Sequence, residues 1–133
     1  MALGSVGGRE GRIYTSLGSS SWIAVNTKEP VLDFKTKPYV FAHIQENMYT
    51  SAFSIFAGGT SQDKSVNIRG AFLGLNLGTG RAELVHAAME GIAMNLKLSL
   101  DELESHAELE KGIQFCGGGA RNPYWMQMFA DVF

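Results

Sequence analysis

The chain has 133 residues, with 11 basic and 13 acidic side chains and a formal net charge of −2, which is the size of a single domain. Hydrophobic residues make up 45% of the chain and charged residues 18%, a composition that excludes an intrinsically disordered protein. The basic residues form no stripe, which excludes an electrostatic nucleic-acid interface, and the single cysteine excludes a disulfide framework and a cysteine-cluster metal site.

Strand-forming residues dominate the first half of the chain. Segments rich in β-branched and aromatic side chains, bounded by turn formers, predict strands over residues 13–17, 21–25, 39–44 and 50–57. Gly18-Ser19-Ser20 joins the first two strands in a hairpin, and residues 26–38, with two prolines, are predicted to form a loop. For residues 50–57 a helix is an alternative, because periodicity does not separate strand from helix in a short apolar run.

The second half predicts a long helix, a short strand and a final helix. Residues 81 to about 107 carry apolar side chains at every third or fourth position, which indicates a helix. This stripe consists of Leu84, Ala88, Ile92, Leu96, Leu100 and Leu103. Thr79 or Gly80 would cap the start of this helix, and Gly112 would end it.

The chain closes with a second strand-to-helix unit. Residues 113–116 are predicted as a strand. Asn122 at the N-cap and Pro123 at the first helical position predict a helix that runs to residue 133. Trp125, Met128 and Phe129 would form its buried face.

Glycine is the unusual residue, at 16 of 133 positions against a typical usage of about 7%. Two glycine-rich turns leave alternatives open. The hairpin turn at residues 18–20 is either a phosphate-binding turn or an ordinary turn with serine self-bonding. Gly117-Gly118-Gly119 before a helix is either a nucleotide site or a connection that needs unusual dihedral angles. A third turn, at residues 58–61, is interpreted on its own as a plain turn.

The remaining chemistry-bearing residues favour structural roles. His43, His86 and His106 have no ligand-like spacing with one another or with Cys116, so no metal site is predicted. The methionines, including Met89, are predicted to serve packing. No catalytic residue is assigned to this chain.

The order of these turns and elements resembles the C-terminal ATPase domain of the FGGY carbohydrate kinases. Residues 70–75 (Gly-Ala-Phe-Leu-Gly-Leu), Glu83-Leu84 and residues 87–90 (Ala-Ala-Met-Glu) have the spacing of that family's second signature. Residues 14–20 resemble its second phosphate turn, with Ser19 where threonine is usual. The sequence from Gly117 through the aromatic final helix resembles the family's closing segment.

The resemblance implies an α/β fold of the ribonuclease-H-like type, similar to actin and hexokinase, in incomplete form. Residues 1–133 would be a fragment of the C-terminal nucleotide-binding domain, without the catalytic N-terminal domain and its general-base aspartate. Residues 22–28 and 41–43 look most like the xylulokinase branch. The implied activity of the intact enzyme is ATP-dependent phosphorylation of a sugar hydroxyl, with Mg²⁺ and a pentulose such as D-xylulose.

The resemblance also implies which residues bind nucleotide. They are Gly18, Ser19, Ser20, Gly59, Gly118, Gly119, Ala120 and Asn122. Gly18 and Ser19 would donate to the transferring or β-phosphate, while residues 118–120 would offer backbone to the adenosine and α-phosphate. Asn122 would lie near the purine or ribose, and Gly59 would flank the base.

The expected partners are nucleotide and sugar, with no nucleic acid and no membrane. The apolar runs are too short to cross a bilayer and the N-terminus lacks the layout of a secretion signal, so a cytoplasmic protein is expected. The alternative hypothesis is a non-catalytic scaffold that forms a homo-oligomer. Its basis would be bare apolar surface from Phe53, Ile55, Phe56, Phe129 and Phe133.

Overall fold

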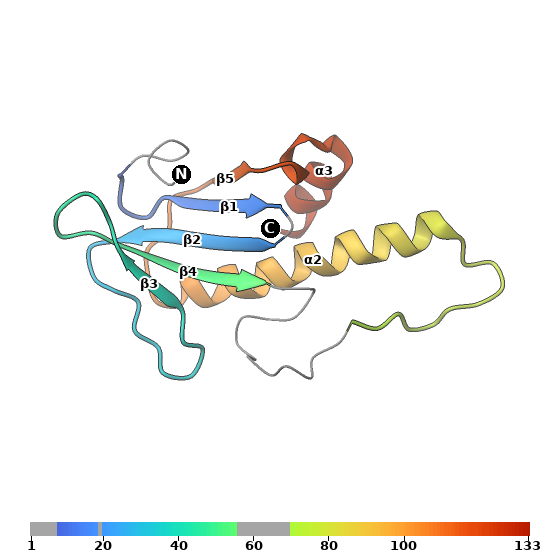
Figure 1. The fold of residues 1–133 in the computed structure, drawn as a ribbon, viewed down its shortest axis with the longest axis horizontal. Coiled ribbons are helices and arrows are strands. Elements are labelled where there is room, and N and C mark those ends of the chain that lie inside the picture. The colour runs from blue at the N-terminus through green and yellow to red at the C-terminus, as the bar shows by residue number, and fades with distance from the viewer. Residues whose placement is uncertain (1–7, 19, 56–69) are drawn as a thin grey trace.

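The computed structural model describes residues 8–18, 20–55 and 70–133, which form one mixed sheet and two long helices (Figure 1). The elements are β1 (Ile13–Leu17), β2 (Ser21–Thr27), β3 (Tyr39–Ala42), β4 (Tyr49–Ile55), α2 (Arg81–Glu104), β5 (Ile113–Cys116), a 3₁₀-helix η1 (Gly119–Arg121) and α3 (Pro123–Val132). The strand order in the sheet is β3-β4-β2-β1-β5. This alternation of strands and helices confirms the predicted α/β class.

The sheet combines an antiparallel part with one parallel pair. β1 pairs antiparallel with β2, β2 with β4 and β4 with β3, whereas β1 and β5 are parallel, with Ser16 opposite Cys116. Parallel neighbours end at the same edge of a sheet, so the glycine turns that follow β1 and β5 leave the sheet side by side (Figure 1).

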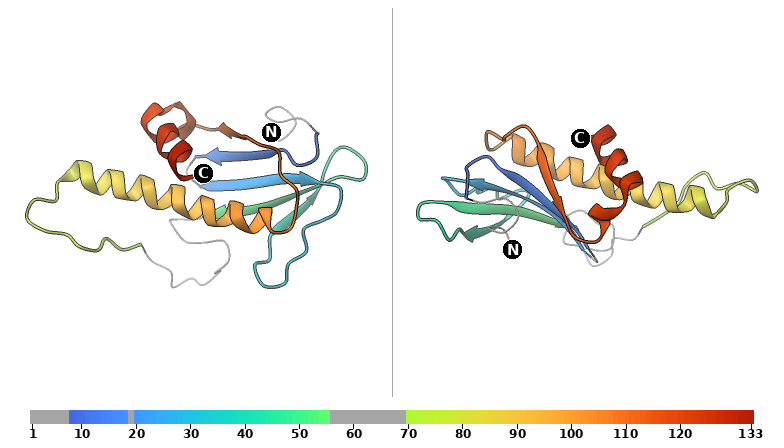
Figure 2. Two further views of the ribbon diagram at one scale, coloured as in Figure 1. Left: turned by 180° about the vertical axis from the view of Figure 1, so that it is seen from behind. Right: turned by 90° about the horizontal axis from the view of Figure 1, so that it is seen from above.

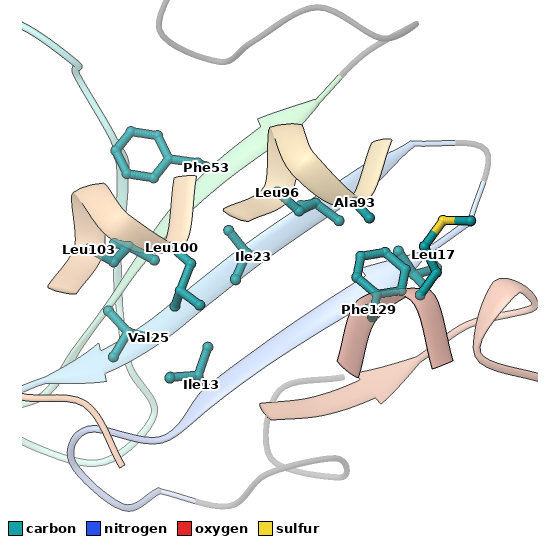
Figure 3. Close-up of a cluster of buried hydrophobic side chains, with 11 residues drawn as sticks. Ile13, Leu17, Ile23, Val25, Phe53, Ala93, Leu96, Leu100, Leu103 and Phe129 are labelled. Carbon is teal, nitrogen blue, oxygen red and sulfur yellow. The ribbon is translucent and has the colours of Figure 1, made fainter. Parts of the chain in front are cut away.

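Both long helices cover the same face of the sheet (Figure 2). Leu96, Leu100 and Leu103 of α2 face the inward side chains of β2, Ile23 and Val25, in a buried cluster (Figure 3). Phe129 of α3 and Leu17 of β1 belong to the same cluster. A separate buried group on the opposite face consists of Tyr14, Ala24 and Ala52, with Trp22 against it. The alternation of β2 between the two faces is the pattern expected of a strand.

The predicted strands are confirmed, with corrections at their ends. β1 and β5 have the predicted bounds, and the strand alternative holds for β4. β2 continues through Asn26 and Thr27, which were predicted as loop, because both are buried and pair with β4. β3 ends at Ala42, short of Ile44, because the His43 amide donates to the Met48 carbonyl and turns the chain.

α2 is shorter and less buried than predicted. It ends at Glu104, and not near residue 107 or at Gly112. Its last turn carries Asp101, Glu102 and Glu104 and no basic residue, which is unfavourable at the negative end of the helix dipole. Ala88 of the predicted stripe is exposed and Leu84 is half-buried, because the first half of α2 extends past the sheet (Figure 1).

The apolar surface on which the scaffold hypothesis was based is largely covered. Phe53 and Phe129 are each 1% exposed and Phe133 is half-buried, so the premise is wrong for these residues. The side chains of Ile55 and Phe56 lie outside the described part of the chain. Among the helices of the described ranges, none has the length and apolarity needed to traverse a bilayer.

The start of α3 follows the prediction. Asn122 is its N-cap and Pro123 its first residue. Asn122 Oδ1 accepts hydrogen bonds from the amides of Tyr124 (3.0 Å) and Trp125 (3.3 Å). Trp125, which is half-buried, and Met128 and Phe129, which are buried, face the core as predicted.

We expect Asn122→Ala to lower the free energy of unfolding by about 0.5–2 kcal/mol, because two helix amides lose their acceptor. Asn122→Ser, which keeps a capping oxygen, should recover most of this loss. Thermal and urea unfolding of the two variants measure the difference. Equal stabilities of Asn122→Ala and the unmodified chain would show that the cap contributes nothing.

Candidate functional site

The turns after β1 and β5 meet through close backbone packing. Gly117 has φ of +94°, and a Cβ atom there would lie 2.6 Å from the carbonyl oxygen of Leu17. A Cβ on Gly119 would lie 2.7 Å from the Leu17 Cβ and 2.8 Å from Trp125 Cζ3. Glycine is therefore required at both positions for the β5 turn to pack against the end of β1.

Gly118 and Gly18 have no such structural requirement. Gly118 has helical angles (φ −63°, ψ −38°), and no atom of the described residues lies within 4 Å of a Cβ built there. Within the described part of the chain, a Cβ on Gly18 would touch just the Ser20 carbonyl oxygen, at 3.6 Å. Both turns thus leave bare backbone facing open space, an arrangement that allows a ligand to approach the main chain closely.

A cavity of about 600 Å³ lies where α2 and α3 approach each other. Its lining residues are Arg81, Ala82, Val85, His86 and Met89 of α2, with Asn122 and Tyr124 at the start of α3. The lining is mainly apolar with a few polar groups, and its volume is in the range of small-molecule sites.

Two contacts between the helices fix the walls of this cavity. Trp125 Nε1–H donates to the Met89 carbonyl oxygen at 3.2 Å. The Tyr124 hydroxyl and His86 Nδ1 share a hydrogen bond of 2.5 Å, and their ring centres are 5.8 Å apart. These contacts hold the start of α3 against α2 beside the cavity.

The predicted site residues fall into three groups. Gly18 and Ser20 form the hairpin turn, which the Gly18 amide closes by donating to the Ser20 carbonyl at 3.1 Å. Gly118, Gly119 and Ala120 lie beside that turn, since β1 contacts η1, and Asn122 lines the cavity. Ser19 and Gly59 lie outside the described residues, so their predicted roles stay predictions.

Sequence reasoning missed the α2 wall of the cavity. The sequence predicts packing for Met89 and a structural role for His86, and it assigns no role to Val85 or Tyr124. The available signal was the spacing of Ala82, Val85, His86 and Met89, which places them on one helix face. That face becomes a cavity wall only because α3 crosses beside it.

Residues 52–133 match the family described as "FGGY family of carbohydrate kinases, C-terminal domain". A xylulose kinase of Staphylococcus xylosus is 32% identical over 76 residues, which cover 57% of this chain and 16% of that protein. The chain thus spans about a sixth of that relative's length.

Solved structures of the same kind share the fold. A xyloylose kinase from Brucella ovis superposes with a TM-score of 0.88 at 20% identity, covering 97% of this chain and 35% of that one. Plasmodium falciparum glycerol kinase with ADP superposes with a TM-score of 0.78 at 18% identity, covering 92% and 34%. The expected actin- and hexokinase-like fold is confirmed. Since the family match covers more than half of the chain, the protein belongs to the FGGY family of carbohydrate kinases.

Proposed function

We propose that residues 1–133 bind ATP as a C-terminal nucleotide-binding domain fragment of a carbohydrate kinase. The observation that carries this proposal is Gly118: no atom of the described residues lies near its Cβ position, and the same turn leads to Asn122, which lines the cavity. Family membership supports a nucleotide as the ligand, and one structural neighbour is described as holding ADP.

The proposed pose follows from the chemistry of the two turns. Gly18, Ser19 and Ser20 would hold the transferring or β-phosphate with backbone and hydroxyl donors. Gly118, Gly119 and Ala120 would face the adenosine and α-phosphate. The apolar cavity beside Asn122 would bind the purine. Gly59, which is not among the described residues, would flank the base.

Mg²⁺ is proposed to accompany the nucleotide. No carboxylate is among the described residues that line the cavity, so these residues do not form a magnesium site by themselves. Mg²⁺ commonly binds through substrate phosphates and water, and it would neutralise phosphate charge when bound.

For the whole protein we propose phosphorylation of a sugar hydroxyl, with a pentulose such as D-xylulose as substrate. The 32% identity to a xylulose kinase supports this choice. A cytoplasmic location is proposed with it, because nucleotide and sugar would both be available there. The 133 residues alone are not expected to phosphorylate sugar, because the resemblance assigns them no general base and a positioned base contributes about 10²–10⁴-fold.

Calorimetric titration with MgATP tests the proposal. We expect saturable binding at up to millimolar nucleotide, and at least tenfold weaker binding by Val85→Trp, because the indole would fill the cavity. Leu98→Trp is the matched control: Leu98 is on the same helix and similarly exposed (58% against 52%), but outside the cavity.

The proposal fails if the unmodified chain gives no heat with millimolar MgATP. If Val85→Trp and Leu98→Trp bind MgATP equally well, the purine does not occupy the cavity and that part of the proposal is wrong.

A further inference from the structure

A cluster of potential metal ligands lies at the end of the molecule opposite the glycine turns. Asp33 belongs to the loop between β2 and β3, Glu102 to the last turn of α2, and His106 to the turn that follows. One ligand atom from each residue lies within 4.8 Å of the other two. The 24 residues of α2, about 36 Å of helix, separate this end from the cavity at Arg81.

Two of the three ligands are already at coordination spacing. Glu102 Oε1 and His106 Nε2 are 3.2 Å apart, four residues apart in the sequence. Ligands of a tetrahedral zinc ion, at about 2.0–2.2 Å from the metal, lie about 3.3–3.5 Å from one another. The Asp33 carboxylate lies within 4.8 Å of both atoms, so a movement of up to about 1.4 Å would bring it to the same spacing.

Hydrogen bonds within the loop orient the Asp33 carboxylate. The Thr36 hydroxyl and amide donate to one carboxylate oxygen, and the Lys35 amide donates to the other at 3.0 Å. These hydrogen bonds lower the pKa of Asp33 to about 2, with the Thr36 side chain the largest cause. Thr36 is itself buried and anchors this part of the loop, so the loop presents the Asp33 carboxylate in a defined orientation.

Among the described residues, no lysine or arginine forms an ion pair with the cluster. Among the ion pairs of the described residues, Lys97 pairs with Asp101, Arg12 with Glu110 and Lys28 with Glu10. None of these cations pairs with Asp33 or Glu102, and the ion-pair partner of Glu102 is the imidazole of His106. Two carboxylates and one imidazole match the charge and the donor preference of a divalent transition metal ion.

We propose that Asp33, Glu102 and His106 bind a divalent transition metal ion, with Zn²⁺ as the best match. His106 also lines a cavity of about 680 Å³, which has room for water as a further ligand. Since the ligands come from two distant segments, the metal would tie the β2–β3 loop to the end of α2. The sequence analysis predicts no metal site. Spacing along the chain does not reveal this cluster, because Asp33 is far from Glu102 and His106 in the sequence.

Zinc titration of the 133-residue chain tests the site. We expect one Zn²⁺ per chain with micromolar affinity and a higher melting temperature with zinc than with chelator, since a ligand that binds only the folded state stabilises it. Glu102→Gln and His106→Gln should each weaken binding at least tenfold. Glu104→Gln, an exposed carboxylate in the same helical turn, is the matched control and should bind as the unmodified chain does.

Circular dichroism without metal establishes that each variant is folded, and Asp33→Asn replaces any variant that is not. Visible absorption of bound Co²⁺ gives a second readout, which His106→Gln should lose. The proposal is overturned if the unmodified chain binds no zinc at micromolar concentration, or if Glu102→Gln and His106→Gln bind it as tightly as Glu104→Gln.

Discussion

Replacing Gly117 by alanine should destabilise the fold by about 2–5 kcal/mol, a large part of the stability of a small domain. Part of this loss comes from the backbone, because φ of +94° is unfavourable for a residue with a Cβ atom. The remainder comes from the contact of 2.6 Å between that Cβ and the Leu17 carbonyl, since β1 and β5 would have to separate at their ends. Thermal and urea unfolding measure the loss.

The matched control is Gly118→Ala, one residue further along the same turn. Gly118 has helical angles, and none of the residues that the structure describes comes within 4 Å of its Cβ position, so alanine should leave stability unchanged or raise it by up to about 1 kcal/mol. Equal stabilities of the two variants would contradict the packing described for the two turns.

Gly118→Ala should nevertheless weaken ATP binding at least tenfold. The methyl group would occupy the space through which the proposed ligand reaches the backbone of residues 118–120. Gly91→Ala is the control for a harmless glycine substitution, because Gly91 is exposed on α2, has open space around its Cβ position and lies outside the cavity. Calorimetry with MgATP on both variants measures the effect.

Unchanged affinity in Gly118→Ala would mean that glycine at this position serves no ligand. A loss of affinity in Gly91→Ala as well would point to a general effect on the fold. Only a loss confined to Gly118→Ala supports the proposed pose.

Local patterns predicted most of the elements in this fold. β-branched and aromatic residues placed β1 and β5 at their correct bounds, and Asn122-Pro123 placed the start of α3. These features depend on neighbours in the chain, such as the acceptor that Asn122 supplies to the next two amides. The sequence pattern does not predict the end of α2 at Glu104. Acidic residues are good helix formers, and their unfavourable effect in the last turn arises only from the negative end of the helix dipole.

Tertiary features were harder to predict. Phe72, Leu73, Leu75 and Leu77, in the segment that carries the family signature, are apolar but exposed. Conversely, Asn26 is polar but buried, and it pairs with Thr50 of β4 in the sheet. Residue spacing does not predict where α3 crosses α2. The contact between His86 and Tyr124, which both line the cavity, could therefore not be predicted from the sequence.

Hydrogen exchange with and without nucleotide tests the central claim that the two glycine turns form one nucleotide site. We expect MgATP to slow exchange at Gly18 and at residues 117–122, and Gly118→Ala to abolish this protection at the same nucleotide concentration. Protection should not depend on protein concentration. Exchange unaffected by saturating MgATP, or slowed only as protein concentration rises, would contradict the account and favour self-association.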